Sequence, residues 1–239
     1  MLRKLKYLFK KLEWLPFHPQ WQFSYLRKRL IKLIKAACQD GTVLDIGCGT
    51  RWAEKILANN TRYIGLDLPL TGVSYDSRPT VSAKADQLPF KADSIENVLI
   101  LDVLEHCPSP DQVIKEISRI LKPGGRVIIE VPFIYPIHDA PFDYQRWTRF
   151  GLEQLIKSSD LKIATIQAIG SPFETAAIIK NLSNAKTFAS LLEQKDLLLL
   201  LIFLLPITTF INNIFACLLT LILPKDETFA FSYQIVASK

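Results

Sequence analysis

Cysteine is scarce in this chain, with four among 239 residues and no two in a C-x-x-C pair. Closely spaced cysteines are typical of zinc sites and small disulfide frameworks, so we expect neither, nor any other metal ligand, and interpret the thiols as reduced and cytosolic. Internal repeats and low-complexity linkers are lacking as well. At 49% hydrophobic residues, the chain is long enough for one domain with a full core and too short for two.

The amino-terminal segment lacks the uninterrupted apolar core and the cleavage site of a secretion signal. Residues 1–35 hold ten Lys or Arg and one acid, so their net charge is +9. Because the whole chain carries +6, the remaining residues carry −3. Apolar residues recur there at helical spacing, which predicts basic amphipathic helices over residues 1–38. Residues 1–15 suit an anionic membrane surface, whereas 20–38 favour a helix that caps the domain. No nucleic-acid partner is expected, because no recognised module accompanies the charge.

Strand and helix patterns alternate from Gly41 onward. We expect strands at 42–46, 62–66, 80–85, 96–101, 126–131, 161–169 and 229–237, and helices at 51–59, 110–121 and 149–158. This alternation predicts the α/β class, with a seven-stranded, mostly parallel sheet and helices on both of its faces.

A glycine turn follows the first expected strand. Gly47 and Gly49 let the backbone approach a ligand that lies across the turn, and Asp67, at the end of the second strand, is able to accept both hydroxyls of a ribose. A dinucleotide fingerprint requires a third glycine where Trp52 stands, so the pattern disfavours NAD.

Five short motifs then succeed one another along the chain. They are Asp45–Gly49, Ala85–Phe90, Asp93–Ser94, Leu101–His106 and Leu121–Gly125. In order and spacing they resemble the motifs of class I S-adenosylmethionine-dependent methyltransferases. The resemblance covers about residues 42–170 and the last strand, and it implies a Rossmann-like fold with S-adenosylmethionine as the cofactor.

The same resemblance implies a role for each motif residue. The implied contacts are Asp45, Gly47 and Gly49 to the methionyl moiety, Asp67 to the ribose, Asp86 and Gln87 to the adenine, and Leu101, Asp102 and His106 to the pocket floor.

A long aromatic and ionisable loop, residues 132–148, follows the fifth strand. Its H-x-x-P-x-D-x-x-R run resembles the branch that contains many methyltransferases of glycan and cell-envelope biosynthesis. His138 is our candidate general base, because an imidazole accepts protons near neutral pH, and His106 is its rival. We expect Asp143 to pair with Arg146 and Thr148 to cap the next helix.

Residues 197–223 contain no charge at all. Two full membrane crossings need about 40 residues, so this run is too short to cross the bilayer and come back to the same side. Pro206 and Asn212-Asn213 are expected to break it, which favours a shallow helical hairpin or in-plane helices. A homodimer interface and a true span are the alternatives.

The expected organisation follows from these segments. Residues 1–38 form basic helices, 39–170 and 226–239 the cofactor-binding domain, and 171–225 a membrane-associated helical insertion at the inner face of the membrane. We expect methyl transfer to a membrane-associated acceptor, a hydroxyl of a lipid-linked or envelope glycan. A prenylated quinone precursor, or a non-catalytic protein that binds the cofactor at the membrane, is the alternative.

Overall fold

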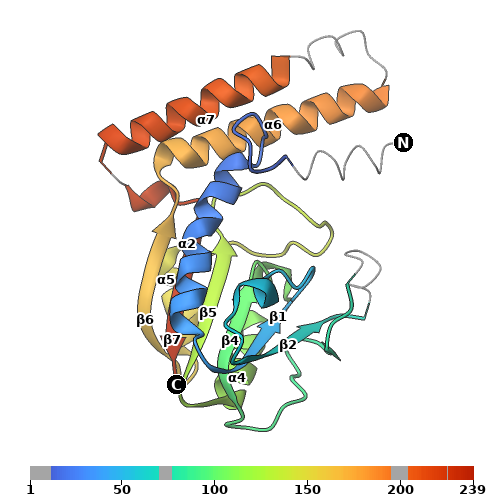
Figure 1. Cartoon of the computed structure of the whole chain (residues 1–239), viewed down its shortest axis with the longest axis vertical. Helices are drawn as coiled ribbons and strands as arrows, with labels where there is room; N and C mark the ends of the chain where they lie inside the picture. Colours follow the sequence, from blue (N-terminus) through green and yellow to red (C-terminus); the bar gives the residue numbers. More distant parts are fainter. Residues whose placement is uncertain (1–11, 70–76, 195–203, 225) are drawn as a thin grey trace. The chain divides into compact units, whose positions relative to one another are not determined.

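A computed structural model describes residues 12–69, 77–194, 204–224 and 226–239 (Figure 1). These residues form two compact units. The sheet unit comprises Leu30–Ala168 with Ser232–Lys239, and the helical unit comprises the described part of Met1–Arg29 with Ile169–Phe231. The basic helix expected over residues 1–15 falls almost wholly outside the described residues.

The sheet has seven strands in the order β3-β2-β1-β4-β5-β7-β6, which confirms the expected fold class. In chain order the strands are β1 Gly41–Ile46, β2 Thr61–Asp67, β3 Val81–Ser82, β4 Ile95–Leu101, β5 Leu121–Pro132, β6 Lys162–Ile169 and β7 Ser232–Ser238. The pairs from β3 to β5 are parallel, whereas β7 runs antiparallel to β5. The strand order reverses between β1 and β4, and open α/β sheets bind ligands at the carboxyl ends of the strands that flank such a point.

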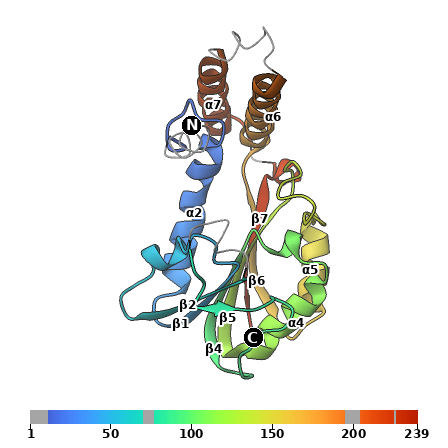
Figure 2. The same cartoon turned by 90° about the vertical axis from the view of Figure 1, so that its right-hand side faces the viewer.

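Helices cover both faces of this sheet (Figure 2). On one face lie α4 Pro110–Ile120 and α5 Arg149–Lys157, each with an apolar stripe turned inward. On the other lies the carboxyl half of α2 Trp21–Ala37, where Leu30 and Ile34 pack against strand residues such as Val43 and Leu99. This part of α2 therefore caps the sheet, as the apolar spacing predicted.

Two elements are shorter than expected. The helix predicted over 51–59 is the single 3-10 turn η1 Ala53–Ile56, because Arg51 adopts a left-handed φ of 56° before it and Leu57 is extended after it. The strand predicted over 80–85 is only Val81–Ser82, since Gln87 turns back to donate to the Lys84 carbonyl. The other short 3-10 turns are η2 Leu104–His106 and η4 Glu227–Phe229.

The helical unit contains α6 Pro172–Gln194 and α7 Leu204–Ile222, which lie side by side in Figures 1 and 2. The expected break at Asn212-Asn213 is wrong, because α7 continues through both residues. Their side chains bind other elements instead: Asn212 donates to Asn181 on α6 at 2.9 Å, and Asn213 accepts from Asn181 at 2.8 Å. Pro206 lies in the first turn of α7, where its missing N–H costs no helical hydrogen bond.

The two sides of α7 differ from those of an ordinary soluble helix. The buried side carries the polar or small residues Thr209, Asn213 and Ala216. The exposed side carries large apolar residues at helical spacing, which are Leu204, Ile207, Phe210, Ile211, Phe215, Leu218, Leu221 and Ile222. Among the described residues, α7 is the one helix long and apolar enough to cross a membrane by length and composition.

Candidate functional site

The glycine turn after β1 is fixed by contacts that only glycine permits. Gly47 has a φ of 72°, and a Cβ there would lie 2.3 Å from the Val103 side chain. Its N–H donates to the Leu66 carbonyl of β2 at 2.8 Å, so the turn is tied to the neighbouring strand. At Gly49 an added Cβ would meet nothing closer than 4.0 Å, so the space beside it is open.

Asp67 lies at the carboxyl end of β2, against this turn. Its Oδ2 accepts from the Gly49 N–H at 2.9 Å and its Oδ1 from the Leu68 N–H at 2.7 Å. A carboxylate is able to accept about four hydrogen bonds, so a carboxylate at this position suits the two hydroxyls of a ribose. The structure thus brings together the two features that the sequence predicted for the cofactor.

Asp45 is 3% exposed and lies within β1. The Tyr63 hydroxyl on β2 donates to its Oδ2 at 2.7 Å, a contact that joins the two strands. Burial raises the pKa of Asp45 to about 7, although the bond from Tyr63 opposes that rise. A direct contact of Asp45 with the cofactor stays a prediction.

The residues predicted to contact the adenine and the pocket floor follow β3 and β4. The Oδ1 atom of Asp86 is buried and has no hydrogen-bond partner among the described residues, so it is available to a donor such as an adenine amino group. Gln87 is exposed, Leu101 ends β4, and Asp102 adopts a left-handed φ of 55° directly after it. The open glycine turn, Asp67 and the orphaned Asp86 oxygen together fit S-adenosylmethionine.

The loop of residues 132–148 is bound to the segment that follows β4. The Tyr144 N–H donates to the Glu105 carbonyl at 2.9 Å, and the Gln145 side chain donates to the Cys107 carbonyl at 2.9 Å. These contacts place the rings of His106 and His138 edge to face, with centroids 4.9 Å apart. The two rival base candidates are therefore neighbours in one cluster.

Two expected contacts of this loop are present. Arg146 binds both carboxylate oxygens of Asp143, at 2.6 and 2.8 Å, and this contact lowers the pKa of Asp143. Thr148 caps α5 by accepting from the Gly151 N–H. Asp143 also accepts from the His138 backbone N–H at 2.9 Å and lies 3.2 Å from its Nδ1 atom. The ion pair thus fixes the orientation of the His138 ring.

Glu105 completes the cluster, although it is not among the residues predicted for the site. Its side chain is fully buried, and neither carboxylate oxygen has a hydrogen-bond partner among the described residues. Burial raises the pKa of Glu105 well above its ordinary value, and the nearby Asp102 adds to the rise. Its position beside His106 in the Leu101–His106 motif was the only available signal, and sequence spacing does not reveal burial.

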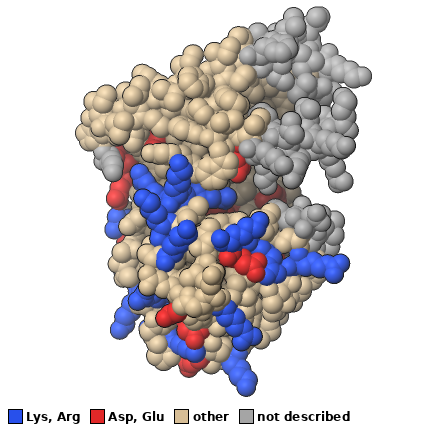
Figure 3. All heavy atoms as spheres, viewed as in Figure 1, with Lys and Arg blue, Asp and Glu red and all other residues tan. Residues whose placement is uncertain are grey.

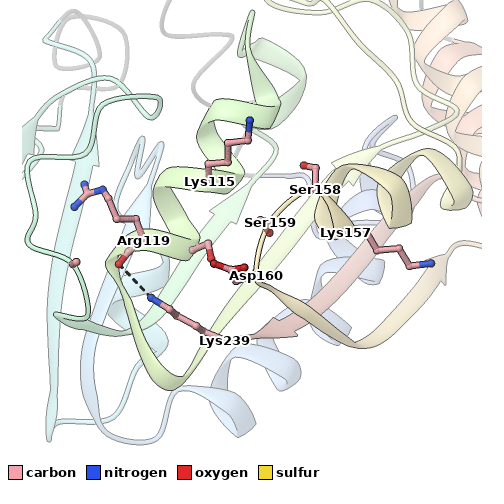
Figure 4. Close-up of a pocket in the computed structure, with 9 residues that line it drawn as sticks. Lys115, Arg119, Lys157, Ser158, Ser159, Asp160 and Lys239 are labelled. Carbon is pink, nitrogen blue, oxygen red and sulfur yellow. Dashed lines mark hydrogen bonds between the residues drawn. The ribbon is translucent and has the colours of Figure 1, made fainter.

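A separate hollow of about 600 Å³ lies elsewhere in the sheet unit (Figure 4). It is lined by Ala92, Lys115, Ser118, Arg119, Lys157, Ser158, Ser159, Asp160 and Lys239, none of them a predicted site residue. Lys239 forms an ion pair with Asp93 there at 2.7 Å. The carboxyl ends of α4 and α5 meet the start of β5 here, at the edge opposite the glycine turn, so we do not assign the chemistry to this hollow.

Residues 44–129 match the methyltransferase domain family. An uncharacterized protein of Methanocaldococcus jannaschii is 36% identical over 120 residues, or 48% of this chain and 46% of that protein. A ubiquinone biosynthesis O-methyltransferase of Pseudomonas paraeruginosa is 33% identical over 109 residues, or 40% of this chain and 46% of that enzyme. The chain thus matches less than half the length of these curated relatives.

Solved methyltransferase structures have a similar fold. An S-adenosylmethionine dependent methyltransferase from Mesorhizobium loti superposes with a TM-score of 0.53 over 90% of this chain and 98% of that one, at 13% identity. Residues 44–129 therefore match a methyltransferase domain, and this match implies S-adenosylmethionine as the cofactor, whereas the solved structure shows a likeness of fold alone. The glycan and cell-envelope branch gains no support from these relatives.

Proposed function

We propose that this protein transfers a methyl group from S-adenosylmethionine to a hydroxyl group on a membrane-associated acceptor. The observation that carries the cofactor half of the proposal is the Asp67 carboxylate, held 2.9 Å from the Gly49 N–H at the carboxyl end of β2. A carboxylate beside an open glycine turn binds a ribose, and the methyltransferase domain match selects the cofactor that contains it.

The cofactor supplies a methyl group already activated on a sulfonium, so the protein mainly has to position the acceptor and exclude water. Asp67 and the turn hold the ribose and methionyl parts, and the Asp86 carboxyl holds the adenine. His138 faces the acceptor on the loop side, where its Nε2 atom takes the hydroxyl proton. Asp143 and Arg146 keep the His138 ring in the required orientation.

The exposed face of α7 supports an acceptor at the membrane. Its buried side is joined to α6 by asparagine contacts and its exposed side is apolar, an arrangement that suits lipid on the outside and polar contacts between helices. Figure 3 shows the helical unit with few charged side chains on the visible face, and Arg27, Lys28 and Arg29 of α2 add basic charge to the same unit. We propose that α7 lies in the plane of one leaflet.

The proposed acceptor is a lipid-linked or envelope glycan, because the loop of residues 132–148 carries several polar groups beside the histidines. A prenylated quinone precursor is the second candidate, favoured by the relatives named ubiquinone biosynthesis O-methyltransferase. Mass spectrometry of lipid extracts, taken with and without the protein, separates the two. The proposal requires a mass increase of one CH2 unit, the net result of methylation, in one of these lipid classes. Unchanged extracts from cells that contain folded protein contradict it.

A flotation assay tests membrane attachment. Phe215→Asp with Leu218→Asp should release the full-length protein from liposomes that contain anionic lipid, because both side chains are exposed on α7. Phe150→Asp is the matched control, since Phe150 is 77% exposed on α5 of the sheet unit and should leave flotation unchanged. High salt alone should weaken the attachment without abolishing it.

Topology distinguishes an in-plane helix from a span. With Cys107 and Cys217 replaced by serine, new cysteines at Lys186 and Asp226 should both react with an impermeant maleimide from the cytoplasmic side. Reaction of the two positions from opposite sides would demonstrate a span. A dimer that remains soluble without lipid would instead indicate that α7 covers a second copy.

A further inference from the structure

We propose that Glu105, His106 and His138 form a binding site for a divalent transition-metal ion of the zinc type. One ligand atom from each residue lies within 4.8 Å of the other two. The Nε2 atoms of His106 and His138 are each 3.8 Å from Glu105 Oε1. Two histidines and one carboxylate are an established donor set for zinc and iron(II), with positions left open for another ligand.

The spacing is close to what such an ion requires. Tetrahedral zinc with bonds of about 2.0–2.1 Å places its ligand atoms about 3.4 Å apart. The two 3.8 Å distances to Glu105 therefore need to shorten by a few tenths of an ångström, and the separation of the two imidazole nitrogens, which lies within 4.8 Å, by up to about 1.4 Å. At 3.8 Å these atoms are too far apart for direct hydrogen bonds, so neither ring is hydrogen-bonded to Glu105.

The buried Glu105 carboxylate is an independent observation that points to a cation. Its side chain is completely buried, and both oxygens lack a partner within the described residues. Buried carboxylates without partners are costly and uncommon, unless a cation or a proton satisfies them. A divalent ion between Glu105 and the two imidazoles satisfies the carboxylate and brings both rings into direct coordination.

The outer contacts of both rings direct their Nε2 atoms toward Glu105. His106 Nδ1 lies 2.9 Å from the Phe142 carbonyl, so this nitrogen carries the proton and Nε2 keeps its lone pair. His138 Nδ1 has two acceptors, Asp143 Oδ2 at 3.2 Å and the Pro136 carbonyl at 3.3 Å, both closer than the Arg146 donor at 3.4 Å. Hydrogen bonds from metal-ligating histidines to a carboxylate or a carbonyl orient the ring in this way.

Exposure places the open side of the site toward solvent. The side chains of His106 and His138 are 23% and 26% exposed, whereas that of Glu105 is not exposed at all. An ion held from below by Glu105 thus has free coordination positions on the side that an acceptor reaches. No cysteine contributes to this donor set, which is why the cysteine pattern of the sequence gave no indication of it.

The role of the ion rests on the proposed function and refines the part that His138 plays in it. The free position takes the oxygen of the acceptor hydroxyl, and the ion lowers the pKa of that hydroxyl. The hydroxyl proton leaves to water, the new carbon–oxygen bond forms as the carbon–sulfur bond breaks, and sulfur keeps the electron pair. His138 then acts as an ion ligand, and not as the proton acceptor.

Metal binding is measured without cofactor or acceptor. Full-length protein is treated with EDTA, and Zn²⁺ is then titrated in competition with a chromogenic chelator, with Co²⁺ absorption in the visible range as a second readout. We expect one ion per chain. Glu105→Gln and His138→Gln should each weaken Zn²⁺ binding by more than about 100-fold, and Asp143→Asn, which changes only the support of His138, by about 10–100-fold.

Controls separate this site from other zinc ligands. His18→Gln removes the third histidine of the chain and Cys107→Ser the thiol next to His106, and both variants should bind Zn²⁺ as the wild type does. Glu105→Gln is the decisive variant, because the Glu105 side chain accepts no hydrogen bond whose loss would unfold the protein. Absence of stoichiometric Zn²⁺ binding, unchanged affinity in Glu105→Gln, or loss of binding in Cys107→Ser overturns the proposal.

The failure of this inference is distinguishable from failure of the proposed function. Protein that binds S-adenosylmethionine and transfers methyl groups at an undiminished rate in EDTA retains its function without the metal site. Protein that binds Zn²⁺ through Glu105 but neither binds the cofactor nor methylates has the site without the function. The combined account expects EDTA to slow methyl transfer while cofactor affinity stays unchanged.

Discussion

Two clusters of polar side chains, one in each of the described units, differ in how far their buried groups are hydrogen-bonded. In the helical unit Asn181, Asn212 and Asn213 bind one another, and Asn213 also donates to the Pro16 carbonyl at 2.7 Å. In the sheet unit both oxygens of Glu105 lack such a partner among the described residues. A satisfied network specifies packing, whereas a buried group without a partner is a place where a proton, a water molecule or a bound ion is expected.

The largest expected effect is on catalysis at the unsatisfied cluster. His138→Ala should lower the methyl-transfer rate by ~10²–10⁴, whether the imidazole accepts the proton or holds an ion, because either role acts on the reacting hydroxyl. Single-turnover measurements with saturating cofactor test this. The His18→Gln variant should keep its rate, and near-normal turnover in His138→Ala would reduce His138 to a packing residue.

A smaller effect is expected on the free energy of unfolding, and here substitution in the asparagine cluster should matter more than substitution of Glu105. Asn213→Leu leaves the Asn181 amide and the Pro16 carbonyl without their partners, which should cost about 1–3 kcal/mol for each buried group left unpaired. Glu105→Gln removes no hydrogen bond and removes a buried carboxyl whose raised pKa opposes folding at neutral pH, so in metal-free protein it should be neutral or stabilising. Urea denaturation measures the free energy of unfolding of both variants. A larger decrease for Glu105→Gln than for Asn213→Leu would contradict the difference between the two clusters.

Asp45 is an intermediate case, a buried carboxyl with one donor, Tyr63. Because burial raises its pKa to about 7 from an ordinary 3.8, the folded protein retains a proton that the unfolded chain releases near pH 4. Stability should therefore fall as pH rises from 4 to 7, by at most about 1.4 kcal/mol per pH unit from this group. In Asp45→Asn the slope should be shallower over this range, and an unchanged slope assigns the dependence to other groups.

Much of the sheet unit was predictable from the sequence, because strand and helix periodicities differ and because Gly47, Gly49 and Asp67 follow strands whose ends meet at one edge. A helix over 51–59 was predicted, but its reduction to the single turn η1 was not, since the left-handed φ of Arg51 depends on its contacts in the fold. The Asn212-Asn213 pair was wrongly predicted to break a helix, also because its contacts in the fold are not visible in the sequence. Asparagine disfavours helix interiors only until tertiary partners such as Asn181 bind its side chain.

The cluster of candidate catalytic residues was predicted only in part. His106 and His138 were singled out by residue type, yet they lie 32 positions apart in the sequence, which gave no sign that their rings lie in contact. Glu105 is one residue from His106, and only the fold shows that its side chain points into a buried space instead of solvent.

Calorimetric titration of S-adenosylmethionine into the wild type and the Asp67→Ala variant tests the central claim most directly. The wild type should bind the cofactor, and Asp67→Ala should weaken binding by about 1.5–3 kcal/mol, or roughly 10–150-fold, as expected for lost hydrogen bonds to a charged group. Asp111→Ala, which alters an exposed carboxylate on α4, should bind as the wild type does. Equal affinity in the wild type and Asp67→Ala, or binding of NADH in place of S-adenosylmethionine, would contradict the account.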